Sequence, residues 1–467
     1  PGQSQLPEQP NLLLFLADDM TYTDLGCTGN PDVKTPHIDR LAAAGIRFTR
    51  CYSPAPTCSP LRQSLFTGLY PVRNGAHPNH SRVYDQVQSL AHYLRPLGYR
   101  TAIVGKRHEA PAKAFPFEML GGSHGDSGKT PAGTDLPLNT ARDFMAASAQ
   151  QPWCLVVTSN QPHTPWNRGD ASAYPPERLT VPPYLIDTPI LREGLSRYYA
   201  EITYMDAQVG QLLGALKSLR QEHNTVVLWL SEQGSQLPFG KWTCYDTGIH
   251  AAAVLRWPAA IRGGHISDAL LSYVDVVPTF FELAGGDTAA LEVDGRSFVP
   301  ILTRPASDHN DIVFSTHTTR GIARGSEAFA VRAATDGRWL YIRNLHASET
   351  FQNVITAKDP IFASWKHVAT PFARSRVQRY SRRPTHELFD LKQDPWCLTN
   401  LADTENPTTD AVRSRLSRRM NAWMQQQGDA GDATERSALL RQPAVKPWRK
   451  NGIYAQQITQ DTIPPAD

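Results

Sequence analysis

Four apolar runs stand out in the first half of the chain, and each ends abruptly in polar or charged residues. They cover residues 11–17, 101–104, 153–158 and 225–230. Apolar side chains at every position, without alternation, are typical of parallel strands that are buried on both faces. The pattern therefore predicts four strands in the interior of one sheet.

Segments with a helical pattern lie between these runs, at residues 36–45, 87–97 and 195–219. Strands that alternate with helices predict an α/β fold: a large, doubly wound, mostly parallel sheet sandwiched by helices. In such a sheet, ligands bind outside the carboxyl ends of the strands. The residues that follow each apolar run are therefore the first place to look for chemistry.

The pattern changes in the C-terminal part of the chain. Residues 327–344 predict a β-hairpin, residues 386–391 another strand, and residues 409–427 an amphipathic helix packed on a small antiparallel sheet. A chain of 467 residues exceeds what one hydrophobic core usually serves. We therefore expect a larger domain over residues 1–345 and a smaller α+β C-terminal domain over residues 346–467.

Residues 347–384 are expected to be irregular and are basic. They contain a cluster of five arginines: Arg374, Arg376, Arg379, Arg382 and Arg383. Such a cluster either contacts an anionic polymer or forms a solvated or salt-bridged face. The polar, proline-rich end of the chain is expected to wrap the surface.

Composition narrows the choice of partners. The formal net charge of +3 is too small to indicate nucleic acid or a membrane surface, and no apolar run reaches the roughly 20 residues that span a bilayer. Six widely spaced cysteines indicate neither a zinc site nor a disulfide scaffold. The start at Pro1 is expected of a mature or trimmed N-terminus, with any signal peptide outside this sequence.

Polar residues follow all four apolar runs. Two runs end in acids and an amide, Asp18-Asp19 and Glu232-Gln233, and two end in bases. The bases are Lys106, His108 and His163. Taken singly, each group also has a simpler interpretation as a cap, a turn or a solvated loop. Because the ends of parallel strands meet at one edge, together they predict a hard-cation site beside an anion site.

Residues 57–68 read Thr-Cys-Ser-Pro-Leu-Arg-Gln-Ser-Leu-Phe-Thr-Gly. Pro60 fits the first turn of a helix, where its missing N–H costs nothing. Cys58 is therefore expected at a helix N-terminus, which favours anions, with Arg62 one turn further along the same face.

This segment resembles the signature C-x-P-x-R-x-x-x-x-T-G of the type I sulfatases, which belong to the alkaline-phosphatase superfamily. Other sulfatase-like segments follow in the family's order, among them Gly105-Lys106-x-His108, Pro162-His163 and Glu387-Leu-Phe-Asp390. Within the family, the chain is most similar to the branch of the heparan N-sulfatases, or sulfamidases. The resemblance covers most of the chain and implies an alkaline-phosphatase-like fold.

In that family a maturation enzyme oxidises the cysteine to formylglycine, and one Ca²⁺ ion is bound. The resemblance implies as metal ligands Asp18, Asp19, Glu232, Gln233 and the modified Cys58. The family's usual pair at the third and fourth of these positions is Asp-Asn, so two side chains here are longer by a methylene. Ca²⁺ is favoured over Mg²⁺ because it tolerates irregular geometry.

The resemblance also implies catalytic roles. The hydrate of formylglycine would attack sulfur, and Arg62 would help to lower its pKa. Lys106 and Lys241 would neutralise charge on the sulfuryl oxygens. His163 would protonate the leaving group, and His108 would take the proton whose loss expels sulfate.

A sulfated saccharide is the expected substrate, because polar, histidine-rich rims suit hydroxylated ligands. His80 and His250 are the candidate substrate contacts, and His80 aligns with a histidine of the sulfamidase branch. His317 and Arg320 also fall in predicted loops, where a solvent-exposed position is the simpler interpretation. Three tryptophans are candidates for sugar stacking or for core packing: Trp166, Trp242 and Trp365.

Several activities remain open. The favoured one is hydrolysis of a sulfate ester of a saccharide or polysaccharide. Sulfamidase activity on N-sulfoglucosamine is the nearest alternative, although Lys241 stands where that branch is expected to carry arginine. Phosphomonoester or phosphonate hydrolysis is a second alternative, and carbohydrate binding without catalysis is a third. The irregular loops favour an exported bacterial protein, periplasmic or secreted, over a lysosomal one.

Overall fold

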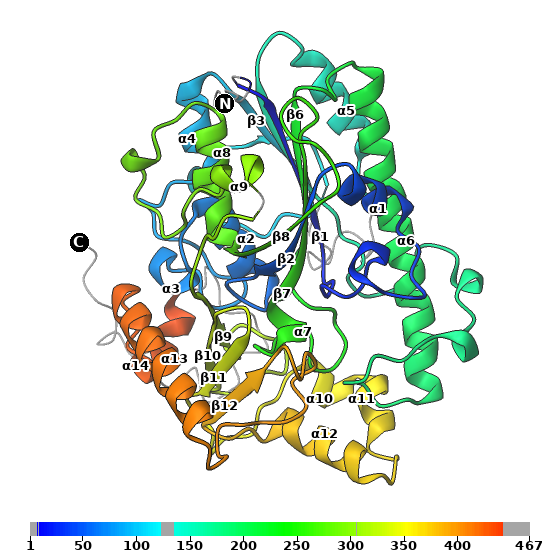
Figure 1. Ribbon diagram of the computed structural model, residues 1–467, viewed down its shortest axis with the longest axis vertical. Helices are drawn as coiled ribbons and strands as arrows, with labels where there is room; N and C mark the ends of the chain where they lie inside the picture. Colours follow the sequence, from blue (N-terminus) through cyan, green and yellow to red (C-terminus); the bar gives the residue numbers. More distant parts are fainter. Residues whose placement is uncertain (1–6, 8, 123–134, 305, 442–467) are drawn as a thin grey trace.

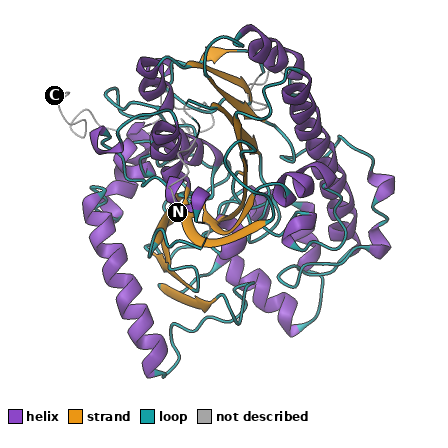
Figure 2. Cartoon of the chain, turned by 45° about the horizontal axis from the view of Figure 1, so that its top comes forward, coloured by secondary structure: helices purple, strands orange, loops and turns teal. Residues whose placement is uncertain are grey.

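The computed structural model describes residues 7, 9–122, 135–304 and 306–441. Over these residues, the chain forms a large sheet with helices on both faces and a small sheet next to it (Figure 1, Figure 2). None of the helices in the described ranges is long and apolar enough to cross a membrane. The polar end of the chain, which was expected to wrap the surface, lies largely outside the described residues.

In the described part of the chain, the large sheet has eight strands in the order β4-β3-β5-β1-β6-β7-β2-β8. They are β1 (Asn11–Ala17), β2 (Ile46–Tyr52), β3 (Arg100–Gly105), β4 (Glu118–Met119), β5 (Trp153–Thr158), β6 (Thr225–Ser231), β7 (His250–Arg256) and β8 (His265–Ser272). The four predicted strands are β1, β3, β5 and β6, which are parallel neighbours. Their prediction is confirmed, whereas the sequence analysis missed the other four.

Helices cover both faces of this sheet, as the α/β fold class requires. One face carries α1 (Pro36–Ala43), α5 (Leu138–Ala147) and α6 (Pro189–Ser218), and the other carries α2 (Cys58–Thr67), α4 (Leu90–Leu94) and α8 (Val276–Leu283). The predicted helix at 195–219 begins earlier, at Pro189, because the Thr188 side chain accepts a hydrogen bond from the Leu191 N–H and caps it.

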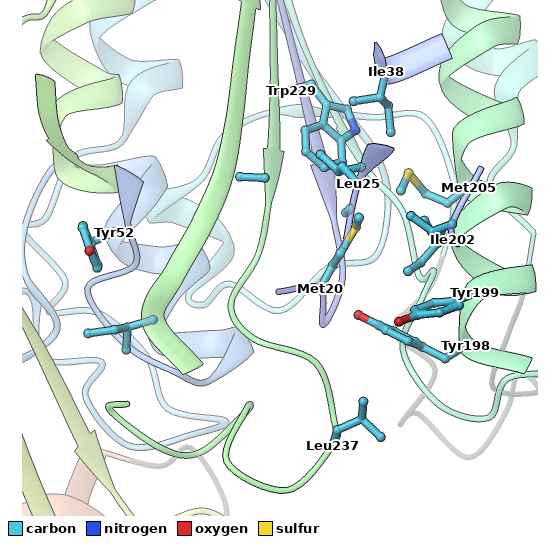
Figure 3. Packing of buried hydrophobic residues seen from close by; sticks show 14 of the residues in the cluster. Met20, Leu25, Ile38, Tyr52, Tyr198, Tyr199, Ile202, Met205, Trp229 and Leu237 are labelled. Atoms are coloured by element: carbon cyan, nitrogen blue, oxygen red, sulfur yellow. The ribbon is translucent and has the colours of Figure 1, made fainter. Parts of the chain in front are cut away.

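The unbroken apolar runs follow from this double cover. Leu13 and Phe15 of β1 pack in the cluster beneath α6, and Leu12 and Leu14 pack in the cluster beneath α2. Successive side chains of a strand point to opposite faces, so a strand covered on both faces has no polar position. Figure 3 shows part of the first of these clusters, with residues of α6 packed towards Trp229 of β6.

The small sheet is antiparallel, in the order β12-β11-β10-β9. Its strands are β9 (Val313–Thr318), β10 (Ala330–Thr335), β11 (Trp339–Asn344) and β12 (His386–Asp390), and α13 (Pro407–Gln426) packs on it. The predicted hairpin, strand and helix are therefore confirmed. Sheet membership changes between β8 and β9, and a domain boundary at residue 345 stays a prediction.

The region from 347 to 384, which was expected to be irregular, is largely helical. It contains α10 (Val354–Lys358), α11 (Pro360–Trp365) and α12 (Pro371–Ser381). Asn353, Asp359 and Thr370 each accept a backbone N–H at the start of one helix. In the sequence, each of these three residues stands directly before its helix and is of a type that commonly caps helices. The other short helices are α3 (Pro71–Asn74), α7 (Asp246–Ile249), α9 (Val299–Thr303) and α14 (Asp432–Ser437).

The arginine cluster of this region does not form one solvated face. Arg376 and Arg383 are buried against aromatic rings, 3.5 Å from the ring centroid of Phe239 and 3.7 Å from that of Phe351. Arg379 donates a hydrogen bond to the Leu398 carbonyl. The other two arginines of the cluster, Arg374 and Arg382, are exposed. Arg376 therefore holds α12 against the main body, whereas these contacts of Arg379 and Arg383 lie within the C-terminal part of the chain.

Candidate active site

The ends of the parallel strands bring the predicted polar residues to one place. Asp18 and Asp19 follow β1, Glu232 follows β6, and Cys58 is the first residue of α2. All four are buried, and one potential ligand atom from each lies within 4.8 Å of the others. The proximity predicted from the strand ends is confirmed, and the cluster has the composition of a possible metal site.

Each acid of this cluster faces a buried cation. Lys106 Nζ lies 2.5 Å from Asp18 Oδ2, and Lys241 Nζ lies 2.7 Å from Asp19 Oδ2. The third cation, Arg62, donates from Nε to Oε1 of the third acid, Glu232. Burial raises the pKa of Glu232 to about 8, so this acid takes up a proton more easily than Asp18 does. Even with all three acids ionised, the charges of the two signs balance, so a divalent cation bound here would leave the site positive and attractive to an anion.

The charges of these pairs follow from burial and neighbours. Burial by itself opposes ionisation of Asp18, but the charge of Lys106 holds the pKa of Asp18 well below its usual value. Burial likewise opposes the charge on Lys106, while Asp18 raises the pKa of that lysine. Both partners are therefore charged at neutral pH.

Cys58 is in a different electrostatic position. Burial, and after it the negative charge of Glu232, raise the pKa of the Cys58 thiol. Its Sγ lies 3.9 Å from a carboxylate oxygen of Asp18 and of Asp19. A protonated thiol is a weak nucleophile and a poor ligand for a hard cation. The position suits an oxygen better than it suits sulfur.

Two buried oxygens of the site lack a hydrogen-bond partner among the described residues. They are Oε2 of Glu232 and Oε1 of Gln233. Gln233 uses its amide nitrogen instead, donating from Nε2 to Asp19 Oδ1. A buried oxygen without a partner is costly, and oxygen ligands are what a hard cation accepts. The longer Glu-Gln pair therefore still fits a cation such as Ca²⁺.

His163 lies beside the same cluster. Its Nε2 is 3.5 Å from Asp19 Oδ2, and its Nδ1 is 2.6 Å from the carbonyl oxygen of Thr164. Burial, and after it the charge of Lys241, lower the pKa of His163. A protonated ring at this position would release its proton readily.

His108 and His80 meet each other. Nε2 of His108 is 2.8 Å from Nδ1 of His80. Gln63 of α2 ties both loops together, because its amide donates to the Ser81 carbonyl at 3.1 Å and accepts from the Ala110 N–H at 3.3 Å. The sequence analysis did not identify this glutamine, although it is the residue after Arg62 in the motif.

The loop that carries His80 is also held from the far end of the chain. Arg441 donates from Nε to the Gly75 carbonyl and from Nη2 to the Arg82 carbonyl, both at 2.9 Å. Its guanidinium lies 4.0 Å from the ring centroid of Tyr84. This clamp was also missed, because no local pattern links residues so far apart in the chain.

His250 is not among the residues that meet at Cys58. Its two ring nitrogens lie 3.0 Å from the Asp246 carboxylate and 2.9 Å from the Thr49 carbonyl. His317, expected in an exposed loop, is instead buried in β9, where its Nδ1 lies 3.3 Å from the Thr57 hydroxyl. Arg320 is buried as well. Both expectations of solvent exposure were wrong, because β9 packs against the segment that leads into α2.

The tryptophans take different places. Trp365 is fully buried in the core beside Phe362. Trp242 lies under Lys241, whose Nζ is 5.2 Å from the indole centroid. Trp166 is half-buried, and its indole N–H donates to the Pro162 carbonyl, next to His163. Trp365 and Trp242 therefore belong to the hydrophobic core, and Trp166 packs partly buried against it.

Comparison with known proteins places this site in a family. A family model described as Sulfatase matches residues 10–286. An ulvan-active sulfatase of Formosa agariphila is 31% identical, covering 98% of this chain and 87% of the relative. Human N-sulphoglucosamine sulphohydrolase is 27% identical, covering 82% and 86%. The phosphonate monoester hydrolase of Agrobacterium radiobacter shares the fold, with a TM-score of 0.67 at 20% identity over 90% of this chain and 96% of its own. The chain belongs to the sulfatase family.

Proposed function

We propose that the protein hydrolyses a sulfate ester of a sulfated saccharide or polysaccharide, using a formylglycine made from Cys58 and one Ca²⁺ ion. The observation that most strongly supports this proposal is the buried cluster of acids around Cys58, with a cation opposite each acid. The two relatives, one named for ulvan and one for N-sulphoglucosamine, support a saccharide substrate. A sulfated polysaccharide occurs outside the cytoplasm, and this supports export of the protein to the periplasm or the medium.

The environment of Cys58 supports its conversion. Formylglycine would replace the protonated thiol by oxygens, one of which serves as nucleophile and another as ligand. Cys58 is 3% exposed, and all ten residues of α2 are buried. A maturation enzyme would therefore have to reach this cysteine before α2 packs into the protein.

The metal would be held by Asp18, Asp19, Glu232 and Gln233. When bound, Ca²⁺ would polarise the oxygens of the sulfate group. Lys106 and Lys241 already carry their positive charges at the cluster, and we assign them to the same sulfate oxygens. With the three acids ionised, the charges of the side chains at the site cancel. The positive charge of the bound divalent ion would then be what attracts the anionic substrate, which supports this assignment.

Proton transfer falls to the histidines. His163 Nε2 would give its proton to the oxygen of the leaving sugar, and its lowered pKa favours that release. His108 would take the proton whose loss expels sulfate. The 2.8 Å contact between its Nε2 and Nδ1 of His80 would orient its ring. His80 would at the same time line the entrance for the saccharide.

The direct test uses Cys58→Ala. This variant should fold and bind saccharide but release no sulfate, because the alanine methyl group carries no sulfur or oxygen and cannot be converted to formylglycine. Mass spectrometry of the peptide containing residue 58 should show the aldehyde in active wild-type protein. Chelation should remove activity, and Ca²⁺ should restore it. Turnover by Cys58→Ala, or an unmodified cysteine in fully active protein, would contradict the proposal.

Matched substrates separate the alternatives. Nitrophenyl sulfate and nitrophenyl phosphate distinguish a sulfatase from a phosphate or phosphonate ester hydrolase, the activity of the structurally similar Agrobacterium enzyme. A glucosamine carrying either an O-sulfate or an N-sulfate distinguishes an O-sulfatase from a sulfamidase. Lys241 in place of the arginine expected for sulfamidases favours the O-sulfate.

A further inference from the structure

A cleft of about 620 Å³ lies between the large sheet and the turns of the small sheet. One side comes from the chain after β1, the end of β2 and the start of β7. The other side comes from the β10–β11 turn and the turn after β12. Of the residues to which a role was assigned from the sequence, His250 alone is among its described lining residues.

One wall of the cleft is a stack of three rings. His250 lies between Tyr22 and Tyr52, with ring centroids 4.0 and 4.8 Å away and ring planes within 17° of its own. Both imidazole nitrogens are held by hydrogen bonds, so the stack is rigid. Across the cleft, Trp396 packs one face on Tyr184, at 5.5 Å. Aromatic walls of this kind are common in pockets for uncharged ring surfaces.

The described lining of the cleft carries three cations, Arg50, Arg338 and Lys392, and two acids, Asp246 and Asp268. Asp246 accepts from the Tyr52 hydroxyl and contacts His250, and Asp268 accepts from the Thr49 hydroxyl. Arg50 and Lys392, in contrast, have no ion-pair partner among the described residues. The stem of Arg50 is braced by the β10–β11 turn, where a Cβ on Gly337 would come within 2.8 Å of it. A third cation, Arg338, pairs with Asp390 at 3.0 Å.

We propose that this cleft is a second binding site for a sulfated saccharide, separate from the residue cluster at Cys58. A sulfate group would take the unpaired charges of Arg50 and Lys392, and the sugar ring would lie along the aromatic walls. The volume is in the range that holds a ligand of a few rings. The identity of the ligand rests on the proposed function, since the site would hold a distant part of the same polymer.

The test measures binding with the inactive variant Cys58→Ala. Calorimetric titration with sulfated ulvan oligosaccharides should give two sites, one of which is lost when Arg50→Ala and Lys392→Ala are added. At the affected site we expect affinity to fall at least tenfold. Desulfated forms of the same oligosaccharides should not bind there. Arg374→Ala with Arg382→Ala removes two exposed charges elsewhere and should change nothing.

Kinetics distinguish this proposal from failure of the function itself. In the active protein, Arg50→Ala with Lys392→Ala should raise KM for the polymer about tenfold and leave kcat/KM for nitrophenyl sulfate unchanged. One binding site in the parent protein, equal binding of desulfated saccharide, or an unchanged KM would overturn the second site. Absence of sulfate release from every substrate would instead overturn the proposed function, while the titration would still report on the cleft.

Discussion

Two buried arginines show how differently the two sheets of this protein use charge. Arg62, in the large sheet's active site, pairs with Glu232 and lies 3.8 Å from Asp18. Arg383, beneath the small sheet, lies 3.7 Å from the ring centroid of Phe351 and donates to the Tyr380 carbonyl. Each is at most 3% exposed. Burial of a charge therefore does not by itself identify a functional site.

The neighbours make the difference. Around Arg62, every charge is held by an opposite charge, so the loss of one leaves another uncompensated in a region without solvent. Around Arg383, the positive charge rests on ring faces, which stay satisfied when it is removed. The first arrangement is poised to bind ions, whereas the second serves packing.

Arg62→Met should have the largest effect. It leaves Asp18 and Glu232 buried without their guanidinium, which should cost about 3–5 kcal/mol of stability and lower sulfate release by about a thousandfold or more. Added Ca²⁺ should recover part of the stability, because it supplies positive charge to the same carboxylates. Urea unfolding with and without Ca²⁺ measures this, with Arg62→Lys as the charge-preserving control. Calcium-independent stability of Arg62→Met would argue against a metal at these acids.

Asp24→Asn tests a buried carboxylate whose hydrogen-bond donors are uncharged, in contrast to the acids around Arg62. Its Oδ2 accepts from the Tyr198 hydroxyl at 2.7 Å and from the Thr21 N–H at 3.0 Å (Tyr198 is labelled in Figure 3). Burial raises the pKa of Asp24 to about 6. The pKa of Asp24 in the folded protein therefore lies above its value in the unfolded chain. Its contribution to the free energy of unfolding is fully present below about pH 4 and is lost as the pH rises through about 6.

Asparagine keeps an oxygen acceptor but has no charge. Relative to wild type, Asp24→Asn should therefore gain stability between pH 4 and pH 7.5, by about 3 kcal/mol at most. Unfolding midpoints of both proteins across this range measure the difference. A constant offset between the two proteins would show that this carboxyl does not titrate in the range.

Arg383→Met should be milder and independent of metal. Loss of the contact with Phe351 should cost about 2 kcal/mol, while kcat per folded molecule stays unchanged. Unfolding in urea, repeated with Ca²⁺, gives the cost, and sulfate release at saturating substrate gives kcat. A calcium-dependent loss would place this arginine with the active site and would remove the contrast with Arg62.

Arg441→Ala should have the smallest effect. It removes the clamp on the loop of His80 without touching the reacting groups, so KM for saccharide should rise a few-fold, about 1 kcal/mol, with kcat little changed. Hydrogen exchange should become faster in residues 75–85. Arg436→Ala, in the same segment but paired with Asp432 at the surface, is the matched control. Equal effects of the two substitutions would show that the clamp acts through general stability.

Sequence reasoning succeeded where local pattern and chemistry coincide. β1, β3, β5 and β6 are apolar at nearly every position because helices cover both of their faces, and that continuity is visible in the chain. The edge strand β8 mixes exposed and buried residues over its first half, β7 has His250 followed by three alanines, and β2 places Arg47 and Arg50 among its apolar residues. These strands offered a weaker periodic signal and were missed.

The sequence by itself determined the parallel core, the strand-end acids and the Cys58 helix, because each depends on residues that are adjacent in the chain. The tertiary structure alone decided which acid each cation faces. It placed His250 in a separate cleft, brought β9 against the approach to α2 through the 3.0 Å bond from the Thr316 N–H to the Pro54 carbonyl, and buried Arg383 among aromatic rings. Those contacts join segments far apart in sequence, and burial is a property of the packed whole that no local pattern encodes.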